Sequence, residues 1–396
     1  MKILMVTREN ARDKRYGLAK SLSPVVEQLQ KQGLAVRYVS QADLTARNVH
    51  WIERLTRGAT KVASLLLPDC LAVLTGGVIQ RLNMGRVAAK IARREGYTHV
   101  HCHDPIICAG ALLFSFRRSF RCGVTQHGFG SYSQAIHEDG APMTTGVMRL
   151  MRRWEASTLA KCDWVVSPTI RGLKQLSRDL SVHPVPQHWV AITHPKPSME
   201  LCERSLARAE LRLSPDKVYI LAVGRIVPLK DFHTLLAACS RLKLKQDWSL
   251  IILGDGDWDA IRREASELGL ADDALILAAT DQPGQWYSAA DLYVSTSTTE
   301  SFGMANHEAL CAGLPAILTA VAAVPEAAGM APVYIPESNI EAVHKALSEL
   351  IGSESARAYR AEQSLSLAGL WPATEAIAEA YIDCYEGRFR DLTAPR

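Results

Sequence analysis

Short apolar runs alternate with amphipathic segments along the first half of the chain, a pattern typical of alternating strands and helices. The apolar runs predict strands at residues 2–7, 35–40, 98–101, 123–126 and 164–167. Helical periodicity predicts helices at 17–32, at 84–95, after residue 104 and around 148–160. Such alternation indicates parallel sheets with crossover helices, and it places the ligand-binding loops at the carboxyl ends of the strands.

The second half of the chain shows the same alternation, and here a strand leads into a basic loop. The apolar run Val218–Val223 is followed by Gly224, Arg225 and, five residues later, Lys230. Gly224 lets the backbone turn, and the two cations then lie where open α/β sheets bind ligands. These residues favour a diphosphate site. Taken alone, the same residues would also be found in an exposed loop with solvated cations.

A second segment, E-S-F-G-M-A-N-H-E from Glu300 to Glu308, follows the predicted strand 290–295. We expect a helix to begin here, which would leave the backbone N–H groups of residues 302–304 free to bind phosphate. If the whole segment is helical, the two carboxyls lie roughly 12 Å apart at about 1.5 Å per residue. That separation exceeds the about 5 to 9.5 Å of a glycosidase pair and suits the two ends of one nucleotide-sugar. Two Glu residues at this spacing are also common on solvated helix faces.

The order of these segments resembles the second domain of family 4 retaining glycosyltransferases. The matching segments are G-R-x4-K-D from Gly224, L-G-D-G from Leu253, A-A-D from Ala289, E-x7-E from Glu300 and A-G-L-P from Ala312. The resemblance implies the GT-B fold, an α/β architecture of two Rossmann-like domains facing each other across a cleft. It divides the chain into an acceptor-side domain (1–194), a nucleotide-sugar donor domain (195–370) and a C-terminal helix (371–396) that packs back on the first domain.

The resemblance also implies roles for residues of the second domain. Arg225 and Lys230 would bind the donor diphosphate, Glu300 the transferred sugar and Glu308 the nucleotide ribose. The remaining donor-binding residues of this domain would be Gly224, Phe302, Gly303 and Met304.

In the first domain the resemblance points to three loops. His127, in T-Q-H-G-F-G, would face the reacting sugar, which gives His127, Glu300, Arg225 and Lys230 as the catalytic residues. Gly17 is the only candidate for the glycine that the family carries near the donor phosphate. His103 and Asp104, in H-C-H-D-P, would lie on the acceptor side.

No metal and no cofactor is expected. His101, His103 and Asp104 do not form a full ligand set at a typical zinc spacing, and Asp257 in G-D-G-D reads as a helix N-cap. The implied reaction moves a hexose from a UDP- or GDP-linked sugar to a hydroxyl of a glycan or lipid-linked acceptor, in polysaccharide or glycoconjugate biosynthesis. A sugar-nucleotide epimerase or hydrolase of the same fold, and a non-catalytic binding protein, stay open. A dinucleotide-dependent dehydrogenase is disfavoured because residues 7–17 lack G-x-G-x-x-G.

Composition and charge bear on compartment and partners. The chain has 396 residues, enough for two domains, and its nine cysteines lack C-x-x-C spacing, which favours reduced thiols in a cytoplasmic protein. Residues 1–200 carry 28 Lys and Arg against 14 Asp and Glu, whereas residues 201–396 carry 17 against 27. The basic first half favours an anionic acceptor or peripheral docking on an anionic membrane over nucleic acid. The run 112–121 mixes aromatic and basic residues as an interfacial segment does, and a helix with a basic final turn is the alternative.

Overall fold

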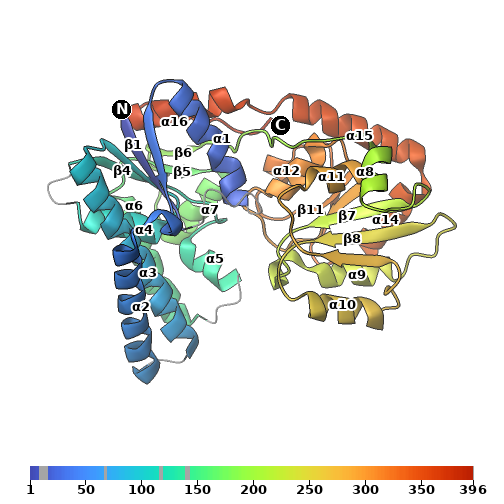
Figure 1. Ribbon diagram of the computed structural model, residues 1–396, viewed down its shortest axis with the longest axis horizontal. Coiled ribbons are helices and arrows are strands. Elements are labelled where there is room, and N and C mark those ends of the chain that lie inside the picture. Colours follow the sequence, from blue (N-terminus) through green and yellow to red (C-terminus); the bar gives the residue numbers. More distant parts are fainter. Residues whose placement is uncertain (9–16, 67–68, 116–118, 139–142, 396) are drawn as a thin grey trace. The chain divides into compact units, whose positions relative to one another are not determined.

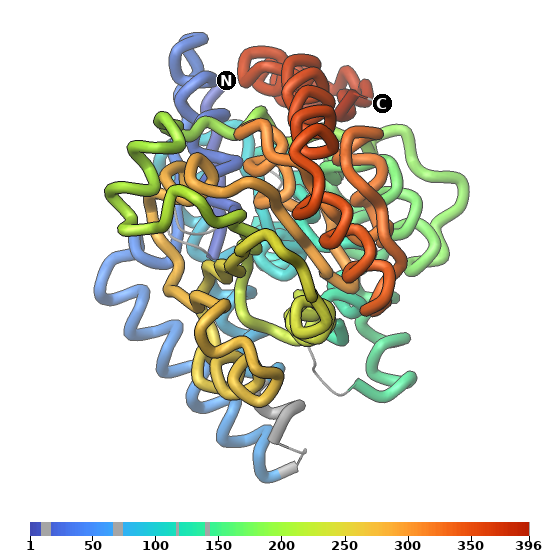
Figure 2. The backbone as a smooth tube through the Cα atoms, turned by 90° about the vertical axis from the view of Figure 1, so that its right-hand side faces the viewer, coloured from blue at the N-terminus to red at the C-terminus, as the bar shows by residue number. Residues whose placement is uncertain are grey.

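The computed structural model describes residues 1–8, 17–66, 69–115, 119–138 and 143–395 (Figures 1 and 2). The chain divides into two compact units. Unit 1 comprises Met1–Pro195 and Ala373–Thr393, and unit 2 comprises Lys196–Pro372 and Ala394–Arg396. Each unit contains one six-stranded sheet, and every strand pairing in both sheets is parallel.

The sheet of unit 1 has the strand order β2-β1-β3-β4-β5-β6. Its strands are β1 (Lys2–Val6), β2 (Ala35–Val39), β3 (His99–Cys102), β4 (Arg121–Thr125), β5 (Val165–Ser167) and β6 (Trp189–Ala191). The connecting helices are α1 (Gly17–Lys31), η1 (Gln41–Asp43), α2 (Ala46–Leu66), α3 (Asp69–Glu95), α4 (Pro105–Leu113), α5 (Tyr132–Glu138), α6 (Thr145–Leu159) and α7 (Ile170–Leu180). The central strands β3, β4 and β5 are buried almost throughout, as expected for strands covered by helices on both faces.

The C-terminal helix α16 (Thr374–Glu386) packs on unit 1, next to α1. Its buried residues Tyr381 and Tyr385 join a core cluster with Trp164 and with Ile3 of β1. The prediction that the last helix returns to the first domain is therefore confirmed.

The sheet of unit 2 has the order β12-β11-β10-β7-β8-β9. Its strands are β7 (Val218–Val223), β8 (Trp248–Leu253), β9 (Ala274–Leu277), β10 (Leu292–Ser295), β11 (Ala316–Thr319) and β12 (Val333–Ile335). The helices are α8 (Arg204–Glu210), η3 (Pro228–Lys230), α9 (Phe232–Cys239), α10 (Trp258–Glu267), α11 (Gly284–Ala289), α12 (Met304–Cys311), α13 (Val324–Ala327), α14 (Ile340–Gly352) and α15 (Glu354–Gly369). Two parallel six-stranded sheets confirm the predicted pair of Rossmann-like domains.

Two sequence predictions fail at helix starts. The helix expected from Glu300 begins at Met304, because Gly303 takes a left-handed conformation (φ 82°) and Phe302 turns inward to stack on His307. Residues 300–302 are therefore not helical, and the estimate of roughly 12 Å, from about 1.5 Å per residue, has no basis. The helix predicted at 84–95 begins at Asp69 instead, and α2 was not predicted.

Candidate functional site

In unit 2 the carboxyl end of β7 is shaped by glycines that allow close approach of the neighbouring loops. A Cβ on Gly224 would lie 3.1 Å from Cε of Lys230, and a Cβ on Gly254 would lie 1.8 Å from the carbonyl oxygen of Gly224. A side chain at position 254 would collide with the backbone of Gly224, whereas one at position 224 would displace the Lys230 side chain by a few tenths of an ångström. The two glycines thus let the Lys230 side chain lie close over the strand end. The G-R-x4-K and L-G-D-G motifs thus form one tightly packed corner, and Arg225 is exposed on it.

The Lys230 ammonium forms an ion pair with Oε1 of Glu300, which also accepts a hydrogen bond from Oγ of Ser297 at 3.2 Å. The two charged side chains are only 18% and 14% exposed. Thr296 fixes the lysine from the backbone side, because its hydroxyl donates to the carbonyl oxygens of Lys230 (3.1 Å) and Asp231 (2.9 Å). The structure therefore brings two of the predicted site residues, 70 positions apart, into direct contact.

The start of α12 carries the next group of predicted residues. Gly303 is the N-cap, and no side chain caps the helix. The first backbone N–H groups of this helix thus form a ready site for an anion. The side chain of Phe302 is buried and stacks on His307 with ring centroids 3.9 Å apart, so Phe302 contributes its backbone here. Nδ2 of Asn306, buried near Gly303, is without a hydrogen-bond partner among the described residues.

Glu308 lies one turn further along α12 and is buried. Its Oε2 accepts a hydrogen bond of 2.9 Å from the hydroxyl of Tyr287 in α11. Burial, followed by the nearby Glu308 carboxylate, raises the pKa of Tyr287 well above its ordinary value, so that the phenol stays a donor. Sequence reasoning did not find Tyr287.

In unit 1 the carboxyl ends of β3 and β4 carry a cluster of histidines. Nδ1 of His103 and Nε2 of His127 are 3.0 Å apart and share a hydrogen bond. The ring of His127 stacks on that of His194 with centroids 5.6 Å apart, and His103 stacks on His101 at 4.4 Å. His101 is held from both sides, by Oη of Tyr385 and Oγ1 of Thr125, each at 2.8 Å.

These imidazoles are kept neutral by their surroundings. Burial, reinforced by repulsion from neighbouring imidazoles, lowers the pKa of His103 and of His127 well below 6.5. The same causes lower the pKa of His101 to about 3. A neutral pair that shares one proton has one donor and one acceptor nitrogen, so His127 can offer a hydrogen bond to a ligand without bringing a charge.

A buried carboxyl, which sequence reasoning missed, holds the loop that carries His127. Glu155 of α6 accepts hydrogen bonds from Nε2 of Gln126 (2.8 Å) and from the backbone N–H of Tyr132 (2.9 Å). These contacts fix both ends of the loop that contains His127. Burial raises the pKa of Glu155 to about 8, while the hydrogen bonds act in the opposite direction. The sequence does indicate this residue, because Glu155 falls on the same side of the predicted helix as the apolar residues Met148, Met151 and Leu159.

Two further predicted residues cap helices, and a third follows a loop that is not described. Asp104 caps α4 by accepting from the N–H groups of Ile106 and Ile107, and it pairs with Arg81 at 2.9 Å. Asp257 caps α10, as predicted. Gly17 is the first residue of α1, and the loop before it, residues 9–16, lies outside the described residues.

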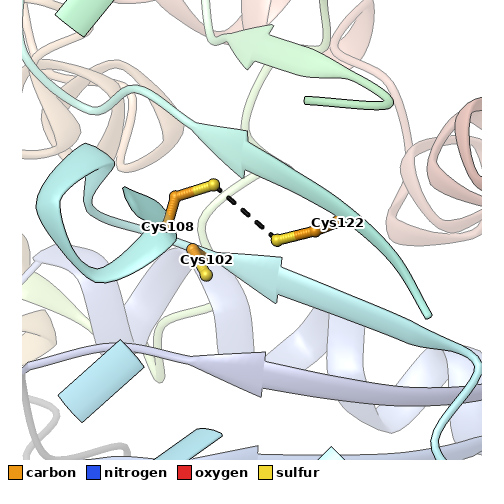
Figure 3. A group of neighbouring side chains, drawn as sticks. All are labelled: Cys102, Cys108 and Cys122. Carbon is orange, nitrogen blue, oxygen red and sulfur yellow. Dashed lines mark hydrogen bonds between the residues drawn. The ribbon is translucent and has the colours of Figure 1, made fainter. Parts of the chain in front are cut away.

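One group of cysteines could in principle hold a metal. Within the described ranges, Cys102, Cys108 and Cys122 are the only three potential ligands of this kind whose atoms all lie within 4.8 Å of one another (Figure 3). They are fully buried in the apolar core of unit 1. Hydrogen bonds to Cys102, Cys122 and Cys162, together with burial, raise the pKa of Cys108 well above its ordinary value. Because metals bind thiolates, protonated thiols that pack as core are the better description. None of the eight described cysteines forms a disulfide bond.

No helix in the described part of the chain is both long enough and apolar enough to cross a membrane.

Comparisons with known proteins bear on this arrangement. Residues 203–365 match the family model described as glycosyl transferases group 1. D-inositol 3-phosphate glycosyltransferase of Mycobacteroides abscessus is 26% identical over 347 residues, which cover 83% of this chain and 73% of that protein. D-inositol 3-phosphate glycosyltransferase 1 of Catenulispora acidiphila is 27% identical over 62% of this chain, and the match spans 61% of its own length.

Solved structures show the same fold. Sucrose-phosphate synthase from Thermosynechococcus elongatus matches with a TM-score of 0.71 at 18% identity, covering 97% of this chain and 98% of that one. Anabaena HepE in complex with UDP and glucose matches with a TM-score of 0.68 at 13% identity, covering 98% and 99%. The fold of this chain is GT-B.

Proposed function

We propose that this chain, which belongs to the glycosyl transferases group 1 family, transfers a hexose from a UDP- or GDP-linked sugar to an acceptor hydroxyl. That family is retaining and uses nucleotide-sugar donors. The acceptor is a hydroxyl of a glycan or of a lipid-linked acceptor, and the reaction belongs to polysaccharide or glycoconjugate biosynthesis. The protein acts in the cytoplasm, on the inner face of the membrane.

The observation that carries this proposal is the corner formed by Gly224, Lys230 and Glu300. A poorly exposed lysine that is held over a strand end, with the uncapped start of α12 in the same unit, suits the two phosphates of a sugar nucleotide. Arg225, exposed on the same corner, would supply a second permanent cation.

We assign roles on this basis. As the bond between the anomeric carbon and the phosphate oxygen breaks, negative charge grows on the leaving diphosphate. Arg225, Lys230 and the backbone amides of residues 302–304 would stabilise that charge. The acceptor oxygen bonds to the same face of the anomeric carbon, and its proton passes to the leaving phosphate oxygen, so the protein needs no nucleophile. Glu300 would orient the sugar hydroxyls and Glu308 the ribose.

His127 would contribute positioning from unit 1. A neutral imidazole held by His103 and His194 can hydrogen-bond a sugar hydroxyl without adding charge to a carbon that itself becomes positive. His103 and Asp104 would lie on the acceptor side, and Gly17 would lie near the donor phosphate. Among the relatives, HepE was solved with UDP and glucose, which favours UDP-glucose as the first donor to test.

A donor panel tests the proposal. The purified full chain is incubated with UDP- and GDP-hexoses and with lipid-linked, glycan and inositol phosphate acceptors, with EDTA present, and nucleotide release is measured. Labelled sugar in a larger product would support transfer. Labelled free sugar or an epimerised nucleotide-sugar would favour the hydrolase or epimerase alternative, and binding of nucleotide without turnover would favour a binding protein.

A further inference from the structure

Helix α2 has an apolar stripe that the fold of unit 1 leaves exposed. One side of the helix packs on α3 through residues such as Ile52 and Ala63, which are 1% and 7% exposed. A second set, by contrast, is exposed to water: Trp51 (46%), Leu55 (40%), Val62 (58%) and Leu65 (78%). At about 100° per residue these four side chains fall within roughly 80° of one another around the helix. They therefore form one continuous stripe.

A row of cations follows one edge of this stripe. Arg47, Arg54 and Lys61 are spaced by seven residues, and all three are exposed. At about 100° per residue they lie roughly 40 to 80° from Trp51. Glu53, the only acidic residue of α2, lies on the other side of the helix at roughly 160° from Trp51. Basic residues beside a large apolar face are the signature of a helix that lies in a membrane interface.

The surroundings of the helix are consistent with this. Figures 1 and 2 show α2 and α3 extending side by side away from the sheet of unit 1. A groove of about 710 Å³ runs along them and is lined by Leu55, Ala59 and Val62 of α2 and Ile79 of α3, with Arg54 also in its lining. The groove offers additional apolar surface next to the stripe.

We propose that α2 docks this protein on the surface of an anionic membrane, with the stripe at the level of the upper acyl chains and Arg47, Arg54 and Lys61 at the lipid phosphates. A second copy of the chain is a poorer occupant, because a self-complementary contact along the stripe would bring two rows of cations together. A nucleic acid would meet the cations but would leave the apolar side chains in water.

The α2 stripe is a different segment from the run 112–121 that the sequence suggested, of which residues 116–118 lie outside the described residues. In the run 112–121 only Leu113 is a well exposed large apolar residue among those described, since Phe120 is buried and Arg121 belongs to β4. Docking through α2 requires neither donor binding nor transfer, so its failure is distinguishable from failure of the proposed function.

Vesicle flotation of the full chain, without donor, tests the proposal. We expect binding to vesicles of phosphatidylcholine mixed with phosphatidylglycerol, and little binding to phosphatidylcholine alone. The double variant Leu55→Ser/Leu65→Ser should lower the partition coefficient about tenfold or more, because each leucine loses its favourable transfer. The triple variant Arg47→Ala/Arg54→Ala/Lys61→Ala should lower it on the order of a hundredfold.

Matched controls use other exposed residues of unit 1. Leu113→Ser/Leu150→Ser removes two leucines that are 71% and 69% exposed, and Arg153→Ala/Lys161→Ala/Lys174→Ala removes three exposed cations. Both controls should bind like the unaltered chain. Equal loss in the controls, binding that ignores lipid charge, or a dimer that Leu55→Ser/Leu65→Ser dissociates in the absence of vesicle binding would each overturn the proposal.

Discussion

The two sheets have the same architecture, but at their carboxyl edges unit 2 carries charged side chains and unit 1 carries neutral imidazoles. In unit 2 four of the predicted residues are charged, and two of them, Lys230 and Glu300, form an ion pair with little solvent exposure. In unit 1 the corresponding edge carries three neighbouring imidazoles, His101, His103 and His127, whose pKa values burial keeps below their ordinary value. Both units have parallel six-stranded sheets, so side chains rather than topology make the difference.

This contrast matches the two demands of the proposed reaction. A leaving diphosphate gains negative charge and is stabilised by fixed cations and amide dipoles. A sugar that becomes positive at its anomeric carbon would be disfavoured by a further cation, whereas a neutral imidazole can still orient its hydroxyls.

Removing the lysine should have the largest effect. We expect Lys230→Ala to lower kcat/KM by about 10²- to 10³-fold, the range found when one group that stabilises developing charge is deleted. Initial-rate measurements of nucleotide release check this. Lys245→Ala, which removes an exposed lysine of the same unit, is the matched control and should keep full activity. A folded Lys230→Ala variant with near-normal rates would remove the lysine from the site.

Glu308 should matter for both activity and stability. Glu308→Ala removes the partner of a buried tyrosine hydroxyl, so we expect a loss of about 1–3 kcal/mol in the free energy of unfolding, together with severely reduced turnover. Tyr287→Phe serves as the control, because it removes the same hydrogen bond and leaves the carboxylate in place. If both variants lose activity equally, Glu308 acts through its hydrogen bond with Tyr287 and does not bind the ribose.

On the neutral side, His127→Ala should lower kcat by about 10- to 100-fold, since it removes a positioning hydrogen bond and no charge. The pH profile distinguishes this from acid–base chemistry. Because the pKa of His127 lies well below 6.5, its imidazole stays neutral at and above about pH 6.5. We therefore expect the ratio of kcat of His127→Ala to kcat of the unaltered chain to be constant from about pH 6.5 to about pH 8.5. A ratio that changes with an apparent pKa near 6.5 would contradict the neutral cluster.

The most specific prediction concerns Glu155. Its pKa is raised from 4.5 to about 8 in the folded protein, so between these values the folded state holds a proton that the unfolded state has released. Its contribution to stability therefore falls as pH rises from about 5 to about 8 and is constant above that. Urea unfolding across this range should show a decline in the unaltered chain that Glu155→Gln lacks. Parallel curves for the two proteins would show that Glu155 does not titrate as proposed.

The sequence predicts the strands well because buried parallel strands are short apolar runs between loops. The runs at 2–7 and 218–223 match β1 and β7 within one residue. It fails at α12, because Phe302 is withdrawn from the turn by stacking on His307, and no local pattern announces that contact.

The residues of the candidate site were likewise predictable from the sequence only where they belong to a local motif. Motif spacing led to Lys230, Glu300 and His127, whereas their partners depend on packing between distant segments. His101 and Tyr385, for example, are 284 positions apart. Glu155 was the partial exception, since a carboxylate on an apolar helix stripe is visible in the sequence and was overlooked.

The proposed function requires that fixed cations of unit 2, without a metal, hold the donor diphosphate. Isothermal titration calorimetry of UDP and GDP in the presence of EDTA tests it most directly, using the unaltered chain, Arg225→Ala, Lys230→Ala and Lys245→Ala. We expect one nucleotide per chain, with affinity lowered at least about tenfold by each of the first two substitutions and unchanged by the third. Equal affinity in all four proteins, or binding that appears only when a divalent metal is added, would contradict the account.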